Sequence, residues 1–254
     1  MSSNVLEMPS NTTSQKIKII LVLAIPAMVE NFFQTVVGFV DTLFVSKLGL
    51  VEVAAVGVTN AILAVYIAVF MALGVGTSSL IAKSVGAGNY ERAKVIAQQS
   101  TWVASIAGLA FGIITLLFAE PLLRLMGAEP NVIAEGAKYF RIVAIPSILI
   151  SLMTVFGSIL RAAGDTKTPM KVGLWINVLH IPLDYVLIFG VFGSGGLGIT
   201  GAAWATTIVR IIGTVALYHY IRKTKLSFPI KRFSVKNKLK FGKKGRSKLR
   251  SLKT

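Results

Sequence analysis

The 254-residue sequence contains no cysteine, two histidines and few charged residues. Without cysteine, the chain has no disulfide, no thiolate metal site and no cysteine nucleophile. The two histidines are far apart, which excludes the HExxH zinc motif. Charged residues make up 15% of the chain, against about 25% in an average soluble domain. No nucleophile with a base partner is visible, so an enzyme is the least supported class.

Apolar residues make up 54% of the chain, and the mean hydropathy is +0.72. A membrane-spanning helix needs about 20 mostly apolar residues. Six stretches meet this condition, near residues 17–45, 53–82, 95–119, 139–160, 172–192 and 199–221. They predict an all-α membrane protein with a bundle of six transmembrane helices. Pro26, Pro146 and Pro182 lie inside these stretches, where each removes a backbone hydrogen bond and can kink the helix.

The net charge of +17 is concentrated at one end of the chain. Residues 222–254 hold 14 of the 27 basic residues and no acidic one, so residues 1–221 carry a net charge of only +3. A basic run beside an apolar span is more typical of a cytoplasmic tail against anionic lipid than of a nucleic-acid-binding arm. We therefore predict a cytoplasmic N-terminus at 1–16, a transmembrane lobe at 17–221, and a disordered cytoplasmic tail at 222–254. Membrane lipid is the expected partner, and nucleic acid is not.

Basic residues also cluster in alternate connections between the stretches, which indicates the orientation in the membrane. The basic residues at the start of the first stretch or after the second and fourth are Lys16, Lys18, Lys83, Arg92, Lys94, Arg161, Lys167 and Lys171. These ends should face the cytoplasm. Six spans then return the chain to the cytoplasm, so both termini are predicted to lie on that side of the cell membrane.

Three acidic residues, Glu30, Asp41 and Asp184, lie within predicted spans. Each carboxylate costs about 2.5–3.5 kcal/mol at the centre of a membrane helix, so acids in such places usually have a function. Arg210 is the clearest base within a span. A structural alternative stays open, in which Glu30 or Asp41 pairs with Arg210 to hold helices together.

The polar residues of the first and fifth stretches follow helical spacing. They form two stripes: Glu30, Gln34 and Asp41 in the first stretch, and Asn177, His180 and Asp184 in the fifth. Residues spaced by three, four or seven positions share one face of a helix. Polar stripes of this kind should face a wet interior of the bundle rather than lipid. The pattern therefore predicts a polar cavity.

The two aspartates are expected at the same depth. Asp41 lies six residues before Lys47, and Asp184 lies six residues before Gly190, which places each about 9 Å below the outer end of its helix. Two carboxylates that meet in a low-dielectric pocket cannot both stay charged at low cost, so one should hold a proton or a bound cation. A proton or sodium site is the interpretation. His180 is interpreted as a hydrogen-bonding partner, and Asn177 as an orienting amide or ion ligand.

Several separate motifs occur in one order along the chain. They are IPAMVENFFQTVVGFVDTLFVSKLG, AKSVGAGNYERAK, RAAGDTKTPM, NVLHIPLDYVLIFG and GLGITGAAWAT. Over about residues 15–230 the sequence resembles the multidrug and toxic compound extrusion (MATE) transporters. The order of these motifs is far more specific than a shared hydropathy pattern.

The resemblance implies one lobe of a twelve-helix, two-lobed transporter that exports cationic, amphiphilic drugs or metabolites in exchange for protons or sodium ions. It implies that Asp41 and Asp184 form the cation site with Asn177, His180 and Thr206, and that Gln34 and Glu30 line the substrate cavity. His180 departs from the asparagine that is usual in this family one turn before the second acid. No cofactor is expected besides the coupling ion, H⁺ or Na⁺, and no other metal.

The resemblance also implies a second lobe of similar size. The chain is therefore expected to be a truncated product, one partner of a split transporter, or a half that forms a homodimer, and truncation is favoured. A second lobe or a second copy is accordingly an expected partner, besides a small cationic substrate.

Two other functions stay open at this point. A lipid-linked oligosaccharide flippase of the same superfamily would need more intramembrane bases for pyrophosphate than Arg210 alone. A membrane-tethered interaction protein that acts through its basic tail would lose activity without residues 231–254 and would be indifferent to Asp184→Asn.

Overall fold

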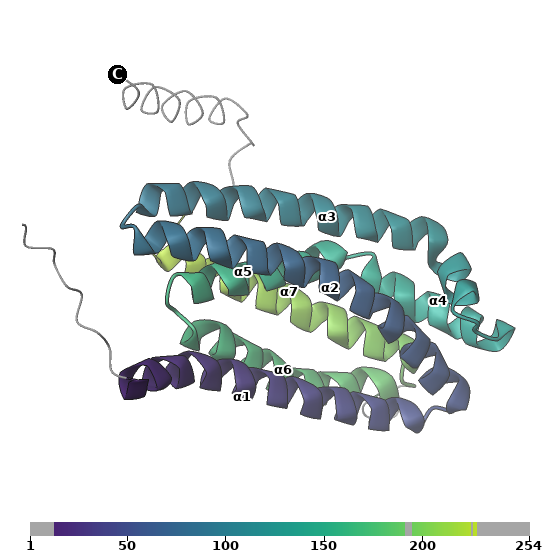
Figure 1. Cartoon of the computed structure of the whole chain (residues 1–254). Coiled ribbons are helices and arrows are strands. Elements are labelled where there is room, and N and C mark those ends of the chain that lie inside the picture. Colours follow the sequence, from purple (N-terminus) through teal and green to yellow (C-terminus); the bar gives the residue numbers. More distant parts are fainter. Residues whose placement is uncertain (1–12, 191–194, 225, 228–254) are drawn as a thin grey trace, which may run out of the picture.

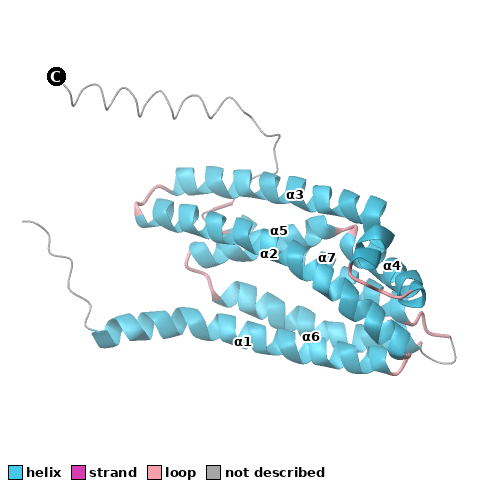
Figure 2. Ribbon diagram, turned by 45° about the vertical axis from the view of Figure 1, so that its right-hand side comes forward, coloured by secondary structure: helices cyan, strands magenta, loops and turns pink. Residues whose placement is uncertain are grey.

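The computed structural model describes residues 13–190, 195–224 and 226–227 (Figure 1). Within these residues every regular element is an α-helix, and there is no strand (Figure 2). The helices are α1 (Thr13–Ser46), α2 (Leu50–Gly86), α3 (Tyr90–Leu125), α4 (Pro130–Ala144), α5 (Ser147–Ala162), α6 (Lys167–Phe189) and α7 (Ile199–Lys223). The prediction of an all-α fold is confirmed.

Within the described residues, up to six segments are long and apolar enough to span a membrane. Five are the single helices α1, α2, α3, α6 and α7, and the sixth is α4 together with α5. The sequence predicted one span at 139–160, whereas the structure has two helices bent by 46° at a short break. Pro146 lies in this break as the residue before α5, and it has no N–H with which to continue the α4 ladder.

The helix ends differ slightly from the predicted boundaries. Helix α1 begins at Thr13, inside the segment predicted as the cytoplasmic N-terminus. Helix α7 ends at Lys223, two residues inside the predicted tail. The rest of the predicted disordered tail lies outside the described residues, except for residues 224 and 226–227.

The helices form a bundle in which α1 and α6 lie side by side along one face, and α2 and α3 lie along the opposite face (Figures 1 and 2). Helix α7 lies between these faces and packs on α6 on one side and on α4 and α5 on the other. One face of α7 thus lies against α6, which carries Asp184. Another face lies against α4 and α5, the bent pair of helices that we call the broken span.

The core consists of two apolar clusters. The first gathers around α2 and α4 and includes the fully buried rings of Phe70 and Phe140. The second gathers around α5 and includes Ile81, Ile159 and Ile221. Outer faces of the helices expose further large apolar side chains, which suits a surface in contact with lipid rather than with water.

Two glycines of α3 form the surface on which the broken span lies. A Cβ added to Gly108 would lie 2.5 Å from the Ile148 Cα, and one added to Gly112 would collide with the carbonyl oxygen of Ile145. The small-residue spacing of Gly108 and Gly112 allows the backbones of two membrane helices to approach closely. The position of the break therefore depends on α3 as well as on Pro146.

Candidate functional site

Asp41 of α1 and Asp184 of α6 meet inside the bundle, as their predicted depths required. Their carboxyl groups are within hydrogen-bonding contact of each other. Asp184 is 1% exposed, and Asp41 is half-buried. Among the described residues, the Oδ1 atoms of both are buried and have no hydrogen-bonding partner. Unsatisfied buried carboxyl oxygens in a native fold point to a bound ion, a water or a proton at that position.

Three further side chains extend this pair into a polar cluster. The hydroxyl of Tyr139 of α4 interacts with that of Thr206 of α7. Thr206 Oγ1 also lies 3.4 Å from His180 Nε2. The Tyr139 side chain interacts electrostatically with both Asp41 and Asp184, and that of His180 with Asp41. These five residues, from four helices, form what we call the acidic cluster.

Tyr139 is the member of the acidic cluster that the sequence did not indicate. It is 3% exposed and packs within the first apolar cluster. In the sequence it is the first residue of an apolar stretch, where a tyrosine is most simply interpreted as a residue at the membrane interface. Only its hydroxyl could have indicated a polar role, because buried tyrosine hydroxyls usually find a partner.

Arg210 lies one helical turn beyond Thr206 on α7 and is half-buried. It interacts electrostatically with Tyr139 and His180. Its Nη1 donates a hydrogen bond to the carbonyl oxygen of Val143, at 3.3 Å. The alternative in which Arg210 pairs with Glu30 is wrong, because Glu30 has a different partner.

Glu30 is held away from the acidic cluster. Its Oε2 lies 3.5 Å from Nη1 of Arg161 on α5, and a Cβ added to Gly173 of α6 would lie 3.2 Å from its Cγ. Eleven residues separate Glu30 from Asp41, or about 17 Å along the helix. The ion pair joins α1 to α5, and the predicted place of Glu30 in a substrate cavity stays a prediction.

Exchanging the two charges tests this ion pair. Glu30→Arg alone or Arg161→Glu alone leaves two like charges facing each other, and the double variant restores an attractive pair. We expect each single variant to lower the stability of the lobe, and the double variant to recover about 0.5–1 kcal/mol, since pairs that are this exposed interact weakly. Unfolding in detergent mixtures measures the difference. Additive losses in the double variant would show that the two side chains do not interact.

The remaining predicted residues lie on the same two helices as the aspartates. Gln34 is exposed on α1, seven residues before Asp41. Asn177 is half-buried on α6, three residues before His180. Both have the helical spacing that places them on the side of their aspartate, and their roles stay predictions.

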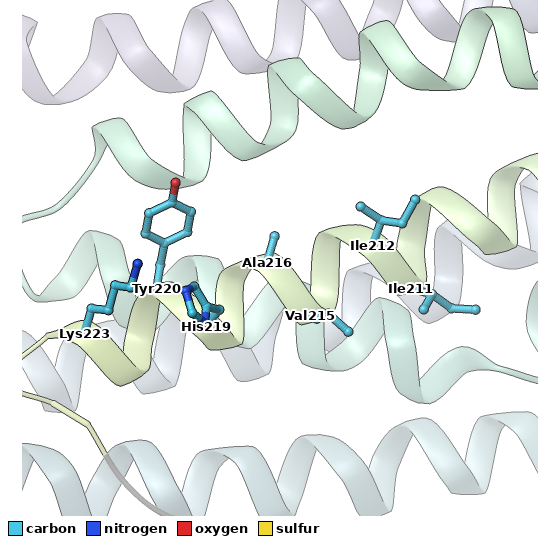
Figure 3. A pocket seen from close by; sticks show the side chains of 7 residues that line it. All are labelled: Ile211, Ile212, Val215, Ala216, His219, Tyr220 and Lys223. Carbon is cyan, nitrogen blue, oxygen red and sulfur yellow. The ribbon is translucent and has the colours of Figure 1, made fainter.

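An apolar pocket of about 560 Å³ lies on the second half of α7 (Figure 3). Its lining residues are Ile211, Ile212, Val215, Ala216, His219, Tyr220 and Lys223. None of them belongs to the acidic cluster. The lining of the pocket begins at Ile211, five residues beyond Thr206, and ends at Lys223.

Apolar helices of membrane-spanning length, packed around a buried pair of carboxyl groups, define a multi-pass membrane protein of the transporter class. The MatE family model matches residues 26–186. The chain belongs to this family, the MATE transporters, whose members are transporters and not enzymes.

Individual relatives agree with this assignment. A probable multidrug resistance protein NorM of Thermotoga maritima is 34% identical over 217 residues, which are 85% of this chain and 47% of the relative. Multidrug resistance protein PmpM of Pseudomonas aeruginosa is 28% identical and is matched over 83% of this chain and 44% of its own length. A structure of a MOP superfamily transporter from Pyrococcus furiosus superimposes with a TM-score of 0.78 at 31% identity, covering 85% of this chain and 47% of that one. The chain thus spans about half the length of the relatives it matches.

Proposed function

We propose that this chain is the cation-binding lobe of an antiporter that exports cationic, amphiphilic drugs or metabolites in exchange for protons or sodium ions. The observation that carries the proposal is the pair of buried, unsatisfied Oδ1 atoms on Asp41 and Asp184. The names of the relatives, multidrug resistance proteins, support drugs as the substrate class.

The chemistry of the pair explains why a cation would exchange with a cationic drug. Two adjacent carboxylates in a low-dielectric site repel each other unless a proton or a metal cation lies between them. A drug cation is attracted by the same negative charge, so binding of one cation weakens binding of the other. Antagonism of this kind is reciprocal. A drug therefore leaves as the coupling ion arrives.

The neighbours of the pair have supporting roles in this proposal. The hydroxyl of Thr206 and the imidazole of His180 supply a donor and an acceptor beside the carboxyl groups, and Asn177 supplies an amide. Sodium would be held by the carboxyl and hydroxyl oxygens, and a proton by the carboxyl groups. Gln34 is assigned to the path by which substrate reaches the pair.

The orientation of the chain in the membrane is inferred from the basic residues in the connections between its spans. We infer that both termini face the cytoplasm, with Asp41 and Asp184 in the outer half of the membrane. In folds built from repeated lobes, transport proceeds when one lobe rocks against the other around a shared site. We propose that a second lobe, or a second copy of this chain, supplies the opposing surface.

Competition between ethidium and the coupling ion tests the proposal on the purified chain. Ethidium fluorescence is titrated at alkaline pH without sodium, then with sodium added, and then at acidic pH. We expect one of the two cations to weaken ethidium binding by a factor in the range of about 5–150, as is typical of coupled sites. Asp41→Asn should reduce this factor to about 1, because the remaining acid no longer needs a shared cation.

Glu91→Gln is the matched control, because Glu91 pairs with Lys94 at the exposed start of α3. This variant should retain the full antagonism. Ethidium binding that is indifferent to both sodium and pH, or antagonism that survives in Asp41→Asn, would contradict the proposal. The condition that weakens ethidium binding, added sodium or acidic pH, identifies the coupling ion.

A further inference from the structure

The pocket on the second half of α7, which we call the α7 pocket, lies where α6 and α7 no longer touch through their backbones. Near the start of α7 they do touch, because a Cβ added to Gly201 would collide with the carbonyl oxygen of Leu187. At Gly213 the atoms nearest to an added Cβ are instead side-chain atoms of Ile176 and Met153, at 3.2 Å. The α7 pocket begins at this level, and among the described residues only α7 lines it (Figure 3).

The lining of the α7 pocket changes from apolar to polar along the helix. The side chains form two rows spaced by four residues, and each row ends in a polar group. The rows are Ile212, Ala216 and Tyr220, and Ile211, Val215 and His219, with Lys223 after them (Figure 3). The pocket extends over twelve residues, or about 18 Å along the helix, and one leaflet of the hydrocarbon core is about 15 Å thick. Its length therefore suits an amphiphile that spans one leaflet.

The polar end of the α7 pocket is positively charged. Lys223 is exposed there, and Arg222 is exposed in the same turn. No acidic residue follows Asp184 in the sequence, and no carboxylate of the described residues forms an ion pair with Lys223. The chemical complement of this end is an anion, and the described part of the chain does not supply one.

The side chains at this end form a small group of hydrogen-bond donors. The Lys223 Nζ atom lies 6.0 Å from the centre of the Tyr220 ring, and the His219 ring lies 6.3 Å from the same centre. An ammonium group, a phenol and an imidazole can all donate hydrogen bonds. A phosphate offers several acceptor oxygens, and lysine is a common phosphate binder. Tyrosine is also enriched at the level of lipid headgroups.

We propose that the α7 pocket binds an acidic phospholipid, with one acyl chain along residues 211–216 and its phosphate among His219, Tyr220 and Lys223. In the orientation proposed above, the end of α7 faces the cytoplasm. The inference rests on that orientation, which places the headgroup in the leaflet that contains negatively charged lipids. The apolar rows bind the chain and exclude a fully polar anion. The basic end selects a negative headgroup over a zwitterionic one.

Native mass spectrometry of the purified chain counts the lipids that stay bound in detergent. The chain is titrated with dioleoyl phosphatidylglycerol and separately with dioleoyl phosphatidylcholine. About 1 M ammonium acetate reduces the Debye length to about 3 Å, which weakens binding to scattered basic residues. We expect one phosphatidylglycerol per chain, bound at least fivefold more tightly than phosphatidylcholine. Lys223→Gln should lower the affinity for phosphatidylglycerol about fivefold, the effect of one basic residue at a membrane surface.

Lys83→Gln is the matched control, because Lys83 is exposed in the last turn of α2. It should leave the affinity unchanged. Val215→Trp fills the apolar part without changing a charge and should weaken binding of both lipids. Val75→Trp, at an equally exposed position of α2, should not. Equal affinities of Lys223→Gln and Lys83→Gln, or unchanged binding in Val215→Trp, would overturn the proposal.

The lipid site and the antiporter function can fail separately. Binding in detergent does not depend on the orientation of the chain, and no residue of the α7 pocket belongs to the acidic cluster. The ethidium competition is therefore measured on the same variants and should remain as in the wild type. Loss of the preference for phosphatidylglycerol in the wild type, with intact competition, rejects the lipid site alone. Selective lipid binding without competition rejects the proposed antiport and leaves the lipid site supported.

Discussion

Replacing Gly112 with alanine is expected to destabilise the lobe by about 1–3 kcal/mol, the usual cost of adding atoms to a packed core. The added Cβ would collide with the carbonyl oxygen of Ile145. A backbone atom cannot swing aside as a flexible side chain can. Helix α3 must therefore separate from the broken span, or the break must shift. Gly108→Ala should act in the same direction, because its Cβ would lie 2.8 Å from the backbone nitrogen of Ile148.

The matched control is Gly76→Ala on the neighbouring helix α2. Gly76 is exposed, and a Cβ there would meet nothing within 4 Å. Alanine at this position should stabilise the helix by about 0.5–1 kcal/mol, because glycine loses more backbone entropy on folding. The two substitutions are chemically identical and are predicted to have opposite signs. Unfolding of the purified chain in increasing dodecyl sulfate measures both. Equal effects would show that the close approach of α3 to the break is not needed for stability.

Much of the fold could be predicted because the membrane imposes strong constraints on sequence. The length of a span and the need to satisfy every backbone group leave long apolar helices as the simplest solution. The meeting of Asp41 with Asp184 was also predictable, because both lie the same number of residues before the end of their helices. The rise per residue of a helix gives the depth of each aspartate from that count, and side chains at equal depth on parallel neighbouring helices can contact each other.

What escaped prediction depends on how helices pack against each other. Tyr139 enters the acidic cluster only because α4 ends at a break and rests on α7. The partner of Glu30 is Arg161, which belongs to a helix distant in sequence. Periodicity along one helix indicates which face is polar, but not which neighbouring helix lies opposite that face. The break itself was predictable as a kink at Pro146, and the hydrogen bond that Arg210 of α7 donates to Val143 beside it was not.

Neutralising either aspartate is expected to remove cation binding entirely rather than by half. If Asp41 and Asp184 were independent sites, the wild type would bind two cations and each single variant would bind one. Two carboxylates in contact with each other instead share a single cation between them. We therefore expect one cation per chain in the wild type and none in Asp41→Asn, Asp184→Asn or the double variant.

The size of the effect follows from electrostatics. An opposite charge at about 4 Å contributes about 4 kcal/mol at an effective dielectric constant of 20, so loss of one carboxylate should lower cation affinity by about 10³-fold. Equilibrium dialysis with radioactive sodium, or proton uptake after a pH jump, counts the bound ions. Asp184→Glu, which keeps the charge but displaces the carboxyl group by one methylene, should still bind one cation more weakly. Two cations in the wild type, or one in either single asparagine variant, would show that the aspartates act separately, and a single shared ion could then not be what displaces the drug.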